Sequence, residues 1–184
     1  MTYSCKSDSR SKKNTGSGTS FDNRGTAMML DLIRAEEMFA AGKLHQALGL
    51  IDELVSKKPQ WADPYLLKGN IYTAVGQHDQ ARSAYEKLVR IDPDYLSAWF
   101  KLGNIVYRKK QYREAINFYN QELTGQQATT LQSKDKQITM LQIGRCYMHL
   151  GKADSALIIY NECMTIDSLY SEVMGDVARL HIDN

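Results

Sequence analysis

The sequence predicts an all-α protein built as a solenoid, in which helical pairs stack side by side and one further helix closes the C-terminal end. Two observations predict this fold. After residue 27, apolar residues recur three and four positions apart and never in strict alternation, which is the spacing of amphipathic helices and not of strands. Small, aromatic and turn residues also return with a constant period over much of the chain, and such a period is the signature of a repeat architecture.

The first element, residues 1–26, is rich in Ser, Lys, Gly, Thr and Asn, and its bulky apolar residues are Tyr3 and Phe21. Such a segment buries too little apolar surface to offset the entropy of ordering it, so residues 1–26 are predicted to be a disordered tail. Residues 27–184 are the predicted repeat domain, with helices of roughly 12–16 residues. The breaks between these helices are Gly42, Pro59, Gly76, Pro93, Gly125 and Gly151.

The repeat period sets the boundaries of four units and a cap. Equivalent alanines in the second helix of the first three units are evenly spaced, at Ala47, Ala81 and Ala115. The units are therefore predicted to span residues 28–61, 62–95, 96–136 and 137–170, and the cap to span residues 171–184.

The third unit is longer than the others. The step from Gly103 to Gly144 exceeds the step from Gly69 to Gly103 by seven residues, and this insertion falls between Tyr119 and Gly144. Seven residues are close to two helical turns, at about 3.6 residues each. The insertion either lengthens the helices around Gly125 or forms a loop within residues 125–136, and the sequence leaves both alternatives open.

Small residues occupy the positions where the two helices of a pair have to approach each other. Helix axes normally lie about 8–10 Å apart, and the closest approaches need a minimal side chain. These positions hold Ala35, Gly69, Gly103 and Gly144 in the first helices, and Tyr85, Tyr119 and Tyr160 are predicted to fill the gap to the next unit.

The last element, residues 171–184, has the pattern of a terminal cap. Val173, Val177 and Leu180 form an apolar stripe that is predicted to pack on the last repeat. The opposite face is predicted to face water, and it carries Glu172, Asp176, Arg179 and Asp183.

The recurring residues resemble the tetratricopeptide repeat family. The second unit contains Tyr65-x2-Lys68-Gly69-x2-Tyr72, then Ala81-x3-Tyr85 and Pro93, and the third contains Trp99-x2-Leu102-Gly103 and Ala115-x3-Tyr119. The fourth contains Ile143-Gly144-x2-Tyr147, Gly151 and Ala156-x3-Tyr160, whereas Asp31, Arg34, Lys110 and Ser168 depart from the pattern. The resemblance covers residues 28–184 and implies a right-handed α-solenoid whose first helices line a concave groove.

Composition argues against several classes of function. The formal net charge of +2, from 23 Lys and Arg against 21 Asp and Glu, does not point to nucleic acid or a membrane surface. No apolar stretch approaches the ~20 residues of a spanning helix. Cys5, Cys146 and Cys163 form neither a disulfide framework nor a paired metal site. Without a nucleophile–base arrangement or a carboxylate pair, the chain is predicted to be a non-enzyme that uses no metal and no cofactor.

The resemblance implies that function resides in the groove, at exposed positions of the first helices. The predicted peptide-binding residues are Asn70, Phe100, Lys101, Asn104, Tyr107, Arg108, Arg145 and His149. Asparagine amides hydrogen-bond a peptide backbone and basic groups hold carboxylates, so the predicted partner is a protein or peptide segment of acidic character. The carboxylate clamp with which this family grips heat-shock chaperone tails is not expected, because Leu66 and Ile138 stand at its lysine positions.

Self-association is the alternative to a monomeric scaffold. Residues 1–26 provide no obvious cap for the N-terminal end of the solenoid, which leaves that end free for assembly. Cys5, followed by a polar tether, also resembles the mature start of a bacterial lipoprotein, although the apolar segment that precedes such a cysteine is absent. The expected location is therefore the cytoplasm or, with a lipid on Cys5, a bacterial envelope.

Overall fold

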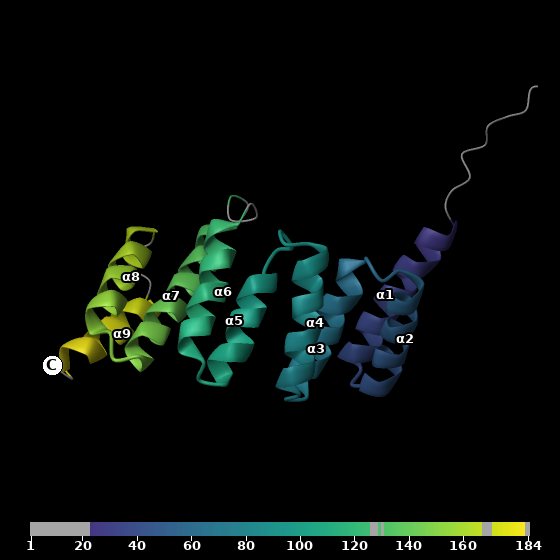
Figure 1. Ribbon diagram of the computed structural model, residues 1–184, viewed down its shortest axis with the longest axis horizontal. Helices are drawn as coiled ribbons and strands as arrows, with labels where there is room; N and C mark the ends of the chain where they lie inside the picture. Colours follow the sequence, from purple (N-terminus) through teal and green to yellow (C-terminus); the bar gives the residue numbers. More distant parts are fainter. Residues whose placement is uncertain (1–22, 126–128, 130, 167–170, 183–184) are drawn as a thin grey trace, which may run out of the picture.

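The computed structural model describes residues 23–125, 129, 131–166 and 171–182, and these form nine α-helices with no β-strand. Four helical pairs follow one another along the long axis of the molecule, and the ninth helix lies at the C-terminal end (Figure 1). The all-α solenoid predicted from the sequence is confirmed. The pairs are α1 (Asn23–Ala40) with α2 (Leu44–Lys57), α3 (Ala62–Ala74) with α4 (His78–Ile91), α5 (Ala98–Arg108) with α6 (Tyr112–Thr124), and α7 (Ser133–His149) with α8 (Ala153–Ile166), and the last helix is α9 (Ser171–Ile182).

Helix α1 begins at Asn23, within the segment predicted to be disordered. Residues 23–26 continue this helix because extending an existing helix adds one hydrogen bond for each residue that is fixed. One and two turns further on, Met28 and Leu32 pack in the apolar cluster that α1 forms with α2, which includes Ala47 and Ile51. The rest of the predicted tail, residues 1–22 with Cys5, lies outside the described residues.

The turn inside each pair contains one residue with left-handed backbone geometry. Three of the pairs use glycine, the residue that adopts this geometry without a Cβ clash, and φ is 72° at Gly42, 76° at Gly76 and 67° at Gly151. The third pair uses Lys110, whose φ is 61°. The departure from glycine at Lys110 therefore leaves the geometry of the turn unchanged.

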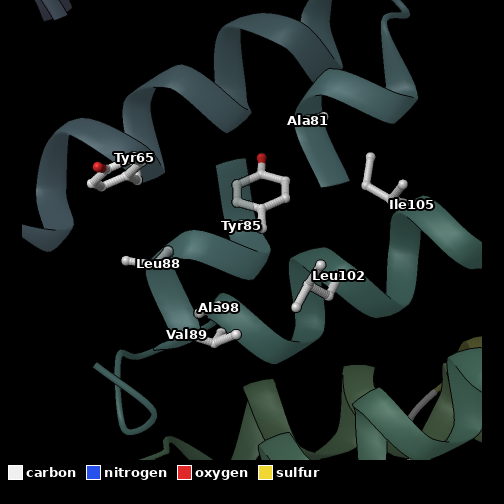
Figure 2. Packing of buried hydrophobic residues seen from close by; sticks show 8 residues of the cluster. All are labelled: Tyr65, Ala81, Tyr85, Leu88, Val89, Ala98, Leu102 and Ile105. Atoms are coloured by element: carbon white, nitrogen blue, oxygen red, sulfur yellow. The ribbon is translucent and has the colours of Figure 1, made fainter. Parts of the chain in front are cut away.

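Contact between a glycine and a tyrosine closes each of the last three pairs. A Cβ atom built on Gly69, Gly103 or Gly144 would overlap the ring of Tyr85, Tyr119 or Tyr160, respectively. These rings are buried, and Figure 2 shows that of Tyr85 among side chains of α3, α4 and α5, with Leu102 and Ile105 coming from the next pair. The small residues thus allow close approach within a pair, and the tyrosines also link one pair to the next.

The seven-residue insertion lengthens α7 at its N-terminal end. Helix α7 has 17 residues, against 13 in α3 and 11 in α5. It begins at Ser133, three turns before Gly144, whereas α3 begins at Ala62, two turns before Gly69. At least one turn of the insertion is therefore helical, and residues 125–132 connect α6 to α7.

Helix α9 packs on the last pair, but its polar face differs from the prediction. Val173 is fully buried in a cluster with Leu141 and Tyr160, and Val177 packs against the same cluster. Asp176 was predicted to face water and is instead only 6% exposed. The prediction was wrong because Asp176 continues the repeat register of the first helices, one period after Gln142, so its side chain faces the preceding pair. The remaining positions predicted for the two faces of the cap lie outside the described side chains: Arg179, Leu180 and Asp183.

Candidate functional site

Four of the predicted groove residues line one cleft between the second and third pairs. The cleft has a volume of about 250 Å³ and lies between α3 and α5, with Tyr85 of α4 contributing to its wall. Asn70 comes from α3, and Lys101, Asn104 and Arg108 come from α5. Because the last three are three and four residues apart on one helix, they share a face, as the sequence predicts.

Both asparagines of this cleft are oriented by a tyrosine hydroxyl. Tyr85 Oη donates a hydrogen bond to Asn70 Oδ1 at 2.9 Å, and Tyr119 Oη donates to Asn104 Oδ1 at 2.8 Å. With Oδ1 engaged, each side chain presents its Nδ2 group, which carries two hydrogen-bond donors. Sequence reasoning did not identify these tyrosines as positioning residues, although both lie 15 residues after their asparagine.

Lys101 is a half-buried cation. It occupies the repeat position of Leu67 in α3, one period earlier, and this position faces the preceding pair. Burial lowers the pKa of Lys101 by disfavouring its charged form. No ion pair to Lys101 or Arg108 occurs among the described residues, whereas the adjacent Lys109 is bound to Asp79.

Arg145, another of the predicted peptide-binding residues, is paired with carboxylates, unlike Lys101 and Arg108. Its Nε donates to Asp176 Oδ2 at 2.8 Å, and its Nη2 donates to Glu172 Oε2 at 3.2 Å. Two carboxylates of α9 therefore neutralise this guanidinium. The sequence spacing could have indicated that these two residues lie close together. Arg145 and Asp176 are 31 residues apart, as are Asn70 and Lys101, which line the first cleft together.

Arg145 lines a second cleft, of about 460 Å³, with Met148, Tyr107 and His149. Tyr160 of α8 and Asp176 of α9 complete its wall. Burial, followed by the neighbouring Asp176 carboxylate, raises the pKa of the Tyr160 hydroxyl. Three predicted groove residues, Tyr107, Arg145 and His149, thus lie in this cleft and not in the first.

An aromatic cluster connects α5, α6 and α7 at the edge of the second cleft. The Tyr107 hydroxyl is hydrogen-bonded to His149 Nε2 at 3.0 Å. The imidazole of His149 also stacks on the ring of Tyr112, with centroids 4.5 Å apart and an interplanar angle of 10°. These contacts give both predicted residues a packing role at the border between the third and fourth pairs.

Phe100 is not brought together with its neighbour Lys101. Its ring packs on Tyr119 with a centroid distance of 5.6 Å, and its backbone N–H donates to Glu122. Consecutive residues of an α-helix point about 100° apart, since a turn has about 3.6 residues, so Phe100 faces the core beside Lys101. Phe100 lines neither of the two clefts described above, and its place in the binding groove stays a prediction.

The described residues contain no arrangement suited to metal or thiolate chemistry. No group of three His, Cys, Asp or Glu side chains with metal-binding geometry occurs among them. Burial raises the pKa of the Cys146 thiol to about 12 and that of Cys163 to about 11, so both thiols stay protonated near neutral pH. No helix in the described ranges has the length and apolarity needed to cross a membrane.

The helical pairs stacked along one axis place this chain among the α-helical repeat proteins. Residues 69–110 match a family model described as TPR repeat, and residues 139–168 match one described as tetratricopeptide repeat. These two stretches of the chain are therefore tetratricopeptide repeats. Both stretches fall within the second to fourth units, whose motifs indicate the same family.

Individual relatives are distant in sequence. Anaphase-promoting complex subunit 3 of Schizosaccharomyces pombe is 23% identical over 122 residues, which are 66% of this chain but only 17% of that subunit. MamA of Desulfovibrio magneticus RS-1, from residue 41 to its end, superposes with a TM-score of 0.72 at 13% identity, covering 85% of this chain and 84% of that one. YrrB, described as a TPR protein with an unusual peptide-binding site, gives 0.68 at 17% identity, covering 83% and 75%. These likenesses support the fold.

Proposed function

We propose that this protein is a non-catalytic scaffold that binds an acidic peptide segment of a partner protein in the cleft between α3 and α5. The observation that carries the proposal is Lys101, a half-buried cation with no ion pair among the described residues. A desolvated charge gains more from a counter-ion than a solvated one does, because interactions are stronger where the effective dielectric is low. A carboxylate of the ligand supplies that counter-ion, and Arg108 adds a second positive charge at the rim.

The two oriented asparagines favour a peptide as the bearer of this carboxylate. Asn70 and Asn104 present their Nδ2 donors in the same cleft, and backbone carbonyl oxygens of an extended segment are the matching acceptors. YrrB, whose fold is similar, is described as having an unusual peptide-binding site. Proteins of this repeat family are generally non-catalytic, and the scaffold role needs no reaction chemistry.

The test is a charge reversal in the cleft of this protein. Its effect is measured on the binding of a partner that the tagged full chain recovers from native lysate. The double variant Lys101→Glu/Arg108→Glu should lower the partner's affinity about tenfold or more and flatten its salt dependence, because screening acts on exposed charge pairs. The variant Lys101→Met keeps the aliphatic stem and removes only the ammonium, so it guards against a folding defect. The control Arg113→Glu/Lys152→Glu changes the same charge at two exposed residues outside the cleft. Equal affinities of the cleft and control variants would place the binding surface elsewhere.

Self-association through α1 is the second candidate function. Met29, Leu30 and Ile33 are 49%, 56% and 44% exposed. Their repeat equivalents in α3, Pro64 for Leu30 and Leu67 for Ile33, are buried, and Leu67 packs in a cluster with residues of α1 and α2. Light scattering across a concentration series separates the two functions, because a scaffold without this contact stays monomeric, whereas α1-driven assembly is abolished by Leu30→Ser/Ile33→Ser.

The lipid anchor on Cys5 is part of this second candidate. One acyl chain gives only marginal membrane binding, so an anchored form would carry several chains on Cys5. Mass spectrometry of the natively expressed protein decides this point. A free Cys5 thiol together with recovery in the soluble fraction would remove the anchor.

A further inference from the structure

The second cleft is built on the same repeat positions as the first. Five residues that line the first cleft have equivalents in the second, all displaced along the chain by one constant interval. Asn70, Thr73, Ala74, Tyr85 and Lys101 correspond in this order to Arg145, Met148, His149, Tyr160 and Asp176. The two clefts therefore share these five repeat positions and differ in the residues that occupy them.

The cation of the second cleft, Arg145, cannot bind a ligand carboxylate as Lys101 is proposed to do in the first cleft. The Arg145 guanidinium already binds Asp176 and Glu172, and a ligand carboxylate at Arg145 would leave the buried Asp176 without its counter-charge. The remaining negative charge belongs to Glu172, whose side chain is 57% exposed and therefore screened by water. The cleft thus offers no unbalanced buried charge to an acidic or a basic ligand group.

What remains as a lining is apolar and aromatic. Met148 takes the place of Thr73, and its flexible, polarisable thioether adapts to irregular shapes. The rings of Tyr107 and Tyr160 stand beside it, and the volume of about 460 Å³ lies in the range of sites that hold small organic groups. We propose that this cleft binds a large apolar or aromatic side chain of the same partner segment whose acidic residue lies at Lys101. This inference rests on the proposed function.

A small-molecule probe tests the second cleft without the partner. The full chain, labelled with 15N, is titrated with N-acetyl-tryptophanamide, and N-acetyl-argininamide and N-acetyl-glutamate are titrated in parallel. The tryptophan probe should shift the backbone amides of Tyr107 and of residues 145–149, and the two charged probes should not compete with it. Shifts spread over the surface, or stronger shifts from the arginine probe at these amides, would overturn the proposal.

Two methionines of similar chemistry provide the matched variants. Met148→Lys places a charge in the cleft and should weaken the tryptophan probe at least about tenfold, whereas Met174→Lys, at a 53% exposed position of α9, should leave it unchanged. Met148→Trp fills the cleft with the chain's own side chain and should have the same effect as Met148→Lys without adding charge. Equal probe affinities for Met148→Trp and wild type would contradict the assignment.

The partner then separates this inference from the proposed function. Met148→Lys should lower the partner's affinity by about tenfold without changing the salt dependence that Lys101 and Arg108 confer. If the reversal at Lys101 and Arg108 has no effect on the partner while the tryptophan probe still binds, the proposed function fails and the second cleft stands as a site. If the reversal abolishes partner binding and the Met148 variants do not alter it, the acidic site stands and the second cleft has no role in the partner complex.

Discussion

Gly103 and Tyr119 meet where α5 lies against α6, and their contact explains why a single hydrogen atom is the side chain at this position. The Tyr119 ring is fully buried and also holds Asn104 through its hydroxyl. A methyl group on residue 103 would overlap this ring, and the ring has no room to withdraw because it is packed on Phe100. One contact thus couples the packing of the pair to the orientation of a groove residue.

We expect Gly103→Ala to destabilise the protein by about 1–3 kcal/mol, since overpacking a buried site forces neighbouring groups to move. The control is Gly49→Ala in α2, where the added methyl meets no atom within 4 Å. That change should stabilise the protein by about 0.5–1 kcal/mol, because alanine is the better helix former. Urea unfolding of both variants measures the difference, and equal effects at the two sites would refute the close-contact argument.

At the scale of elements, α5 is capped by a side chain of its partner helix. Glu122 of α6 is 1% exposed and accepts hydrogen bonds from the backbone N–H groups of Ser97, at 3.0 Å, and Phe100, at 3.2 Å. These groups lie at the N-terminus of α5, where a carboxylate satisfies free donors and the helix dipole. Burial raises the pKa of Glu122, and the backbone donors lower it by less.

The pH dependence of stability should therefore carry a contribution from Glu122. Its folded pKa lies above its ordinary value of 4.5, so the contribution to stability is complete below the unfolded pKa and is lost as the pH rises through the folded pKa. Glu122→Gln does not titrate. The free energy of unfolding of wild type minus that of Glu122→Gln should accordingly decrease as the pH rises above about 4. A difference that grows over this range would mean that the hydrogen bonds outweigh burial.

The apolar contribution of helix α9 to stability should come from its buried positions and not from its exposed ones. Val173 is fully buried against the last pair, and Met174 beside it is 53% exposed. Val173→Ala is expected to cost about 1–3 kcal/mol, whereas Met174→Ala should stay within ~0.5 kcal/mol. Thermal unfolding compares the two, and equal melting temperatures would show that α9 is not a stabilising cap.

At the scale of the whole molecule, the fold was predictable because the same residue types recur at equivalent positions in successive repeats. Glycine, alanine and tyrosine at fixed spacing report contacts within a pair, so Gly69, Tyr85 and their equivalents were placed correctly from the sequence. The N-terminal extension of α7 was not determined, since seven residues fit both a helix and a loop. The start of α1 was missed because residues 23–26 continue the helix without packing residues of their own.

The candidate site was predictable only in part, because a helix position does not reveal what the next pair brings to it. Lys101, Asn104 and Arg108 share a face by helical spacing alone, and this was read correctly. The neutralisation of Arg145 depends on Asp176, which belongs to a different helix and was predicted to lie on a solvent-exposed face. Knowing the register of α9 would have identified this contact, since Asp176 stands where Lys101 stands in α5.

Each pair in the stack contacts mainly its neighbours, so a substitution that weakens one junction should lower stability near that junction. This property distinguishes a solenoid from a protein with a single globular core. Leu102, fully buried in α5, packs with Tyr85 and Leu88 of the preceding pair (Figure 2). Leu141, 1% exposed in α7, packs in the cluster that includes Val173 of α9. Both lie in buried clusters that join one pair to the next element.

Leu102→Ala and Leu141→Ala remove the same groups and should each cost about 2–5 kcal/mol. In a one-dimensional stack, Leu102→Ala weakens the junction between α4 and α5, so amide hydrogen exchange should accelerate most in α3–α6. Leu141→Ala should instead accelerate exchange in α7–α9 and leave α1–α4 close to wild type. Exchange measured by mass spectrometry on the two variants tests this directly. A uniform increase over all helices in both variants would show that the chain unfolds as one cooperative unit, whose pairs are not independent.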